Sequence, residues 1–163
     1  MVLNGCFPNL ATFNVRIQFL VNKGRAWDAN KLIGFMHRLD IIPDEVTYNL
    51  LIKGFCRAGY VDMAKRVYSH LNDRGIEPNI KIYQTMIHYL CRAGDFDLAY
   101  TMTKNSMEKN WFPSIDTILK LLEGLRKNGK IDKARLIITL AQKRIPPFSA
   151  HQMRTMQLML SRR

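Results

Sequence analysis

The residue types that most often carry out chemistry are present in this sequence, but they form no recognisable catalytic or metal-binding pattern. No Cys-x-x-Cys or His-x-Glu pair occurs, and the histidines lack the spacing of metal ligands. The four are His37, His70, His88 and His151. Asp and Glu are few and scattered, and no side chain pairs with a base that would make it a nucleophile. We therefore expect no enzyme, no metal and no cofactor, with the histidines in surface or groove positions.

The spacing of glycine, proline and alanine indicates that the chain repeats every 35 residues. Three landmarks keep this register four times each: Gly24, Gly59, Gly94 and Gly129; Pro8, Pro43, Pro78 and Pro113; Ala29, Ala64, Ala99 and Ala134. The tetrapeptide CRAG also occurs at residues 56–59 and 91–94. A period of this size predicts an array of supersecondary units, each of which buries its apolar face against a neighbour.

One unit, residues 45–79, predicts two helices. The first covers residues 47–57, and its apolar side chains have the spacing of one helical face: Tyr48, Leu51, Ile52 and Phe55. The second runs from about residue 60 to residue 72, and its Ala64 is small enough to mark a close helix crossing. Gly59 can end the first helix in the left-handed conformation, and Pro78 prevents the second from continuing. Each unit is therefore predicted to be a hairpin of two antiparallel helices.

This unit resembles the pentatricopeptide repeat. The matching residues are 46–49, 51–52, 54–59, 64, 75–76 and 78–79. The tetratricopeptide repeat is also a helical hairpin, but its period is about 34 and its opening is Trp-x-x-Leu-Gly. The resemblance covers nearly the whole chain and implies an all-α fold, a right-handed α-solenoid of antiparallel helical hairpins. The uniform spacing resembles the P class, which is built only of standard-length repeats.

The 35-residue register also predicts where the repeats begin and end. Residues 1–9 match the end of a repeat, so we expect this chain to be the C-terminal portion of a longer array, or a gene model begun at an internal Met. The predicted repeats are residues 10–44, 45–79, 80–114 and 115–148, with residues 149–163 as a C-terminal capping helix. The fourth repeat is one residue shorter than the others in this division.

The resemblance implies sequence-dependent binding of single-stranded RNA, at one base per repeat, on the surface of the first helices. In the family, the fifth residue of the first helix and the last residue of the repeat choose the base. These pairs are Asn14 with Asp44, Asn49 with Asn79 and, as a weaker pair, Gln84 with Ser114. The family code assigns uracil to the first pair and cytosine to the second. An amide can donate and accept hydrogen bonds, so it can address a base edge.

Other positions carry further roles in the family. Ala11 and Val46 fit the second position, which forms an apolar wedge between bases, whereas Lys81 and Asp116 do not fit it. Leu119, at the fifth position of the fourth repeat, cannot form a hydrogen bond with a base. We therefore expect base reading to fade after the second repeat. Phosphate contacts are expected from basic residues near the end of the first helix: Arg57, Arg92 and Lys127. The ordinary alternative for each Asn is a residue that starts a helix.

The positive charge of the chain is concentrated near its C-terminus. The net charge is +12, and residues 115–163 hold 11 Lys and Arg against 3 Asp and Glu. This balance favours a polyanionic partner, although a merely soluble basic surface would have the same composition. The rival function is a structural module that docks on ribosomal RNA or partner proteins without base readout. An enzyme would need an appended catalytic domain.

Further expectations concern location and the cysteines. The family acts in organelles on RNA stabilisation, processing, splicing or translation, which implies the mitochondrion or, as the alternative, the chloroplast. No apolar run approaches 18 residues, so we expect no membrane partner, and no small-molecule substrate is indicated. Cys56 and Cys91 occupy one position in successive repeats and are expected to pack as small apolar residues, whereas Cys6 lies in the N-terminal tail.

Overall fold

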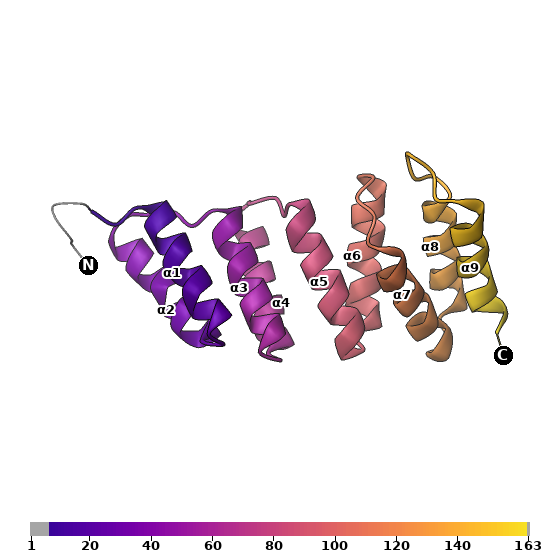
Figure 1. Cartoon of the computed structure of the whole chain (residues 1–163), viewed down its shortest axis with the longest axis horizontal. Helices are drawn as coiled ribbons and strands as arrows, with labels where there is room; N and C mark the ends of the chain where they lie inside the picture. The colour runs from indigo at the N-terminus through magenta and orange to yellow at the C-terminus, as the bar shows by residue number, and fades with distance from the viewer. Residues whose placement is uncertain (1–6, 163) are drawn as a thin grey trace. The chain divides into compact units, whose positions relative to one another are not determined.

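The computed structural model describes residues 7–162, which form helices joined by short loops, with no strand among them (Figure 1). The helices are α1 Leu10–Asn22, α2 Ala26–Arg38, α3 Glu45–Arg57, α4 Val61–Asp73, α5 Ile80–Ala93, α6 Phe96–Glu108, α7 Ile115–Lys127, α8 Ile131–Ala141 and α9 Ala150–Ser161. The predicted all-α helical repeat fold is confirmed. Cys6 and most of the predicted N-terminal tail lie outside the described residues.

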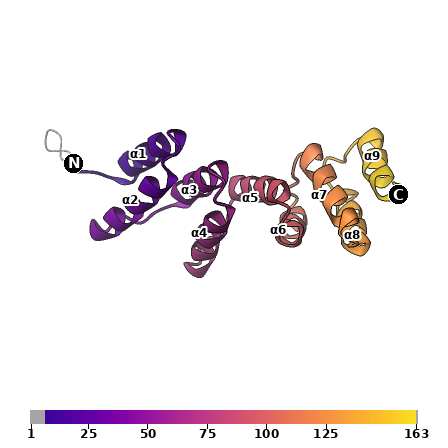
Figure 2. The ribbon, with the colours of Figure 1, turned by 90° about the horizontal axis from the view of Figure 1, so that it is seen from below.

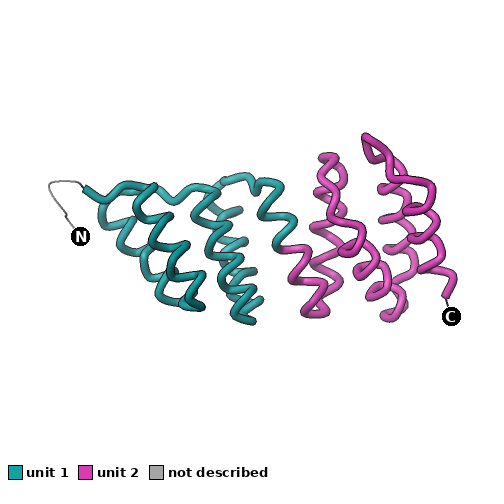
Figure 3. The backbone as a smooth tube through the Cα atoms, viewed as in Figure 1, with its two compact units in different colours: residues 1–85 teal, residues 86–163 magenta. Residues whose placement is uncertain are grey.

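The chain forms two compact units, residues 1–85 and 86–163, and the boundary falls inside α5 (Figure 3). We call them unit 1 and unit 2. None of the helices in the described part of the chain is long and apolar enough to cross a membrane.

Unit 1 contains two hairpins, α1 with α2 and α3 with α4, and α3 also packs on α1 and α2. Figure 2 shows α1 and α3 side by side in one layer, with α2 and α4 in the other. The largest fully buried side chains of these helices are Ile17, Met36, Tyr48, Leu51, Ile52, Phe55 and Leu71. Ala29 and Ala64 are completely buried, as expected where two helix backbones approach closely.

In unit 2, α7 contacts α6, α8 and α9, while α8 also contacts α6 and α9. The apolar face of α7 is buried through Ile118, Leu121, Leu122 and Leu125. Helix α9 begins like the first helix of another hairpin and buries Met156. The last helix thus packs on α7 and α8, with Met156 as its buried apolar side chain.

The turns between the helices use left-handed backbone conformations, as the glycine spacing predicted. Gly59 has a φ of +87° at the end of α3, a value that side chains with a Cβ rarely adopt. Asp40 and Asn110 follow α2 and α6 with φ values of 55° and 59°, at the repeat position that Gly75 occupies after α4 with a φ of 70°. Asp and Asn tolerate this region better than other residues with a side chain, which explains how they replace glycine here.

The first helix of each repeat starts at a polar residue that caps it. The capping residues are Asn9, Asp44, Asn79, Ser114 and Ser149, and each accepts a hydrogen bond from the backbone N–H three residues later. These caps are 35 residues apart throughout the chain. Because Ser149 lies 35 residues after Ser114, this spacing favours an end of the fourth repeat at residue 149 rather than at residue 148. The boundaries themselves stay a prediction.

Cys56 and Cys91 are buried, as their shared repeat position predicted. Burial raises the pKa of the Cys56 thiol to about 12 and that of the Cys91 thiol to about 11. Both thiols are therefore protonated at neutral pH and act as apolar packing groups.

Candidate nucleic-acid interface

The structure brings Asn14 and Asp44 together, although 30 residues separate them in the sequence. The Nδ2 of Asn14 donates to the Oδ1 of Asp44 over 3.4 Å. The same Oδ1 accepts a hydrogen bond from the backbone N–H of Thr47 at 3.0 Å. Because Asp44 caps α3, its carboxylate is held at a fixed place beside the α1 side chain that is predicted to read the base with it.

Asp44 remains ionised at neutral pH. Its partial burial opposes ionisation, but hydrogen bonds from Thr47 and Asn14 outweigh the burial and hold the pKa of the carboxyl below its ordinary value. The hydrogen bonds that Asp44 accepts from described residues all go to Oδ1. Its Oδ2 can therefore accept a hydrogen bond from a ligand, and the ionised group cannot donate one.

The second predicted pair is arranged differently. Asn79 caps α5 through its Oδ1, which accepts from the N–H of Ile82 at 3.0 Å, and its Nδ2 donates to Glu45 at 2.8 Å. The Oδ1 of Asn49 is buried and accepts no hydrogen bond from a described residue. Asn79 is thus bonded to Glu45 rather than to Asn49.

The residues predicted to lie between bases are on the surface. Ala11 is exposed on α1, and Val46 is 53% exposed on α3. Lys81 and Asp116, which do not fit this role, are also exposed. Exposure leaves Ala11 and Val46 free to contact a base, and their wedge role stays a prediction.

The later positions offer less for base reading. Gln84 is exposed in unit 1, and Ser114 lies in unit 2, where its hydroxyl caps α7 and is 3.0 Å from the hydroxyl of Thr117. Leu119 is half-buried and apolar. The polar pattern that Asn14 and Asp44 form in unit 1 has no counterpart at Leu119.

The three predicted phosphate contacts are exposed, but their local partners differ. Arg57 makes no ion pair with another described residue. Arg92 lies over the ring of Tyr89, with 5.8 Å from the guanidinium carbon to the ring centroid. Lys127 forms an ion pair with Glu123 at 2.9 Å. Each lies in the last turn of its helix, where a cation is also favoured by the helix dipole.

Unit 2 carries most of the net positive charge. It holds 14 Lys and Arg against 6 Asp and Glu, whereas unit 1 holds 11 against 7. Some of these cations bind within the unit: Lys130 and Lys133 both pair with Asp97, and Arg126 donates to the carbonyl oxygen of Arg162 at 3.2 Å. The excess positive charge suits contact with phosphate groups.

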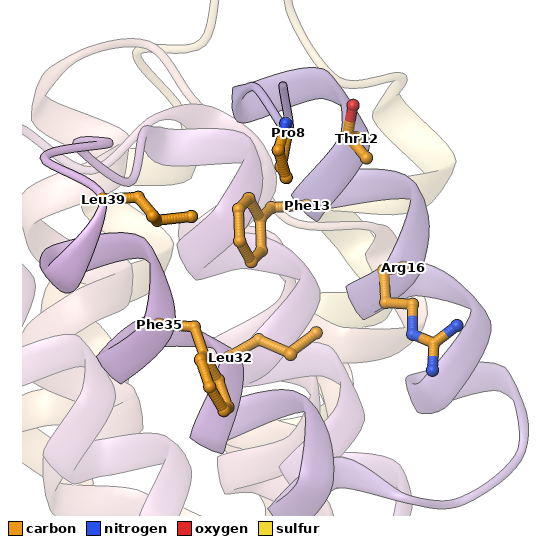
Figure 4. A pocket seen from close by; sticks show the side chains of 7 residues that line it. All are labelled: Pro8, Thr12, Phe13, Arg16, Leu32, Phe35 and Leu39. Carbon is orange, nitrogen blue, oxygen red and sulfur yellow. The ribbon is translucent and has the colours of Figure 1, made fainter. Parts of the chain in front are cut away.

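A pocket of about 220 Å³ lies on the first hairpin, and neither Asn14 nor Asp44 lines it. Figure 4 shows Phe13 between Pro8 and Leu32, with Phe35 and Leu39 completing the apolar lining. In the second hairpin, the positions 35 residues after Phe13 and Leu32 are Tyr48 and Val67, and both are buried. The lining is therefore typical of a surface on which hairpins stack.

No group of three or more possible metal-ligating side chains occurs anywhere in residues 7–162.

Two residues of this interface were not singled out from the sequence for a role of their own. Thr47 contacts both Asn14 and Asp44, and Glu45 binds Asn79. The third position of the repeat holds Thr12, Thr47, Ile82 and Thr117. The sequence therefore already shows that a hydroxyl recurs at this position and that Ile82 lacks it.

The repeat fold and its matched residues define the class of protein. The PPR repeat family model matches residues 8–57 and 43–84, and a PPR repeat model matches residues 74–104, so that the matches together span more than half of the chain. The chain belongs to the pentatricopeptide repeat family. No curated protein matches the sequence significantly.

Solved structures share the fold at low sequence identity. Pentatricopeptide repeat protein PPR10 from maize is 22% identical, with a TM-score of 0.69 over 96% of this chain and 21% of that protein. PPR10 in complex with an 18-nt psaJ RNA element gives a TM-score of 0.65 with the same identity and coverage. The PPR domain of Arabidopsis thaliana protein-only RNase P 1, solved in complex with tRNA, is 17% identical, with a TM-score of 0.74 over 98% of this chain and 84% of that domain. The chain thus spans about a fifth of the length of PPR10.

Proposed function

We propose that this chain binds single-stranded RNA and that unit 1 selects the bases. The observation that carries the proposal is the contact between Asn14 and Asp44, which places a donor amide beside an ionised acceptor. The proposal is supported by membership of the family and by the RNA named in the complexes of two structures with this fold. Asn14 with Asp44 would bind uracil, and Asn49 with Asn79 would bind cytosine, at one base per repeat.

Uracil suits the first pair chemically. Its Watson–Crick edge has one N–H donor between two carbonyl acceptors. The free Oδ2 of Asp44 can accept from that N–H, and the remaining N–H of Asn14 can donate to a carbonyl. Gln84 and Ser114 form a weaker third pair in the proposal. Ala11 and Val46 would lie against the base faces.

Phosphate contact is proposed for three cations, Arg57, Arg92 and Lys127. The family often places a basic residue against phosphate at this position, and the exposure of all three side chains supports the proposal. The protein would act by occupying a strand, in organelle RNA stabilisation, processing, splicing or translation, without chemistry by this chain. The organelle would be the mitochondrion or, as the alternative, the chloroplast.

Energetics predicts weak binding by this chain on its own. Each base contact of the stacking type contributes about 1–3 kcal/mol, so two reading pairs supply roughly 2–6 kcal/mol. Association itself costs about 4–15 kcal/mol. Tight binding would therefore require further repeats beside these ones.

A second candidate is a structural module that docks on ribosomal RNA or a partner protein. It is favoured by the charge of unit 2, with 14 Lys and Arg against 6 Asp and Glu, and by the apolar Leu119 at a reading position. Such a module would depend on the basic surface and would show no preference for base sequence.

The experiment that separates the two candidates compares short single-stranded RNAs that differ only at two adjacent positions, UC against GA, across a salt series. Base reading predicts a UC preference of about fivefold or more, which Asn49→Ala reduces at the cytosine position. Equal binding to both RNAs, with a steep salt slope that the substitution leaves unchanged, would contradict base reading and favour docking.

A further inference from the structure

Thr47 lies buried between the two residues of the first reading pair. Its side chain is fully buried, and its hydroxyl is 2.7 Å from the Oδ1 of Asn14 and 2.9 Å from the Oδ1 of Asp44. The same hydroxyl accepts from the backbone N–H of Asp44 at 3.2 Å. Thr47 therefore joins a side chain of α1 to the cap of α3.

A hydroxyl has one proton to donate, and the geometry favours Asn14 as its acceptor. The Asn14 contact is the shorter one, and the Oδ1 of Asp44 already accepts from the Thr47 N–H and from Asn14. When Thr47 donates to the amide oxygen of Asn14, that oxygen faces the protein and the NH₂ group faces Asp44. The reverse orientation would turn the amide oxygen of Asn14 toward the Oδ1 of the ionised Asp44, so that two acceptors would face each other.

The second reading pair lacks this arrangement. The residue 33 positions after Asn14 is Thr47, whereas the residue 33 positions after Asn49 is Ile82, which is buried and has no hydroxyl. The buried Oδ1 of Asn49 correspondingly finds no hydrogen-bond partner among the described residues. The two pairs thus differ in whether a neighbouring side chain fixes the amide.

We infer that Thr47 is a positioning residue that orients the amide of Asn14 and thereby sets the base preference of the first repeat. The inference rests on the proposed function, because a preference requires that Asn14 contacts a base. Ile82 leaves Asn49 without this constraint, so no neighbouring hydroxyl fixes which end of its amide faces a ligand. The first position is therefore more selective than the second.

The test compares Thr47→Val, which keeps the shape but removes the hydroxyl, with Thr47→Ser, which keeps the hydroxyl. The measured quantity is the ratio of dissociation constants for RNAs with uracil or cytosine at the first position. Thr47→Val is expected to lower the uracil preference about fivefold or more, and Thr47→Ser to retain it within about twofold. Thermal unfolding of each variant checks that the fold is intact.

Thr12→Val is the matched control for loss of a helix cap. Thr12 occupies the same repeat position, and its hydroxyl donates to the capping residue Asn9 at 2.9 Å. This variant is expected to leave the uracil preference unchanged. If the wild-type preference survives Thr47→Val, or falls equally in Thr12→Val, the positioning role of Thr47 is overturned. The proposed base reading would still stand. No preference in the wild-type protein would overturn the proposed base reading and this inference with it.

Discussion

Unit 1 and unit 2 are built from the same helical hairpin but differ at the positions that could contact a ligand. At the fifth position of the first helix, unit 1 presents Asn14 and Asn49, whereas α7 of unit 2 presents Leu119. Unit 2, in contrast, has the larger excess of Lys and Arg over Asp and Glu. In the proposed function, one packing scheme would serve two tasks: base selection in unit 1 and attraction of phosphate groups by the excess positive charge of unit 2.

The largest expected effect concerns the packing that both units share. A Cβ added at Gly54 in α3 would lie 2.7 Å from the buried side chain of Val21, which is β-branched and stiff. Overpacking of this kind costs about 1–3 kcal/mol, which outweighs the gain in helix propensity of about 1 kcal/mol. Gly54→Ala is therefore expected to lower the free energy of unfolding by up to about 2 kcal/mol, measured by urea denaturation.

Gly34 in α2 is the matched control, because an added Cβ there meets no atom within 4 Å. Gly34→Ala is expected to stabilise the chain by about 0.5–1 kcal/mol. In unit 2, a Cβ at Gly124 would overlap the ring of Phe96, so Gly124→Ala should resemble Gly54→Ala. Stabilisation by either Gly54→Ala or Gly124→Ala would show that the two units do not share this close contact.

The second largest effect would be a change in the base that the first repeat of unit 1 prefers. Asp44→Asn is expected to change the preference at the first position from uracil to cytosine, with about a tenfold change in the ratio of dissociation constants. Asn keeps the helix cap, since Asn9 and Asn79 cap α1 and α5 in the same way. Unchanged uracil preference in a variant with wild-type unfolding temperature would count against the Asn14–Asp44 pair as the reader.

A smaller effect should distinguish two cations at the same repeat position. Arg57→Ala removes a cation without an ion-pair partner among the described residues and should lower affinity equally for all RNA sequences. The slope of log affinity against log salt should fall by about 0.7 for one lost phosphate contact on a single strand. Lys127 is paired with Glu123, so Lys127→Ala should change the slope by less than half of this.

Sequence-dependent losses in Arg57→Ala would mean that Arg57 contacts bases rather than phosphates. A larger slope change in Lys127→Ala than in Arg57→Ala would show that the ion pair with Glu123 does not limit Lys127. Either result would contradict the expected difference between the two cations.

The smallest effect is the pH dependence that Asp44 adds to stability. Its pKa is lower in the folded chain than its ordinary value, so the stabilisation is present above that ordinary value. The stabilisation is lost as the pH falls through the folded-state pKa. The stability difference between wild type and Asp44→Asn should therefore shrink between pH 6 and about pH 3. A difference that stays constant over this range would contradict the lowered pKa.

The fold could be predicted because its signals recur along the sequence. Each landmark occurs four times, which set the positions of the predicted hairpins. Gly59 marked a turn because glycine adopts the left-handed conformation, and Ala64 marked a close packing position because its side chain is small. The residues Asp44, Asn79 and Ser114 were chosen as reading positions, and the structure adds that each caps a helix. The two roles are compatible for Asp44, because the cap uses one carboxylate oxygen.

The individual contacts of the candidate interface could not be predicted from the repeat spacing, since they join residues from different helices. Thr47 reaches Asn14 and Glu45 reaches Asn79 only after hairpins pack together, at sequence separations of 33 and 34 residues. Lys130 and Lys133 likewise meet Asp97 across two helices of unit 2. Spacing identifies positions that are equivalent, but side-chain pairing depends on which residues occupy the neighbouring repeat.

The measurement that tests the central claim most directly is a base-by-base preference profile of the wild-type chain. Single-stranded RNAs are varied at four adjacent positions, one base at a time, and the dissociation constants are compared at constant salt. The account predicts a preference for uracil at one position, a weaker preference for cytosine at the next, and less than about a twofold preference where Leu119 would lie. Equal affinity for every base at all four positions, or the strongest preference opposite Leu119, would contradict base selection by unit 1.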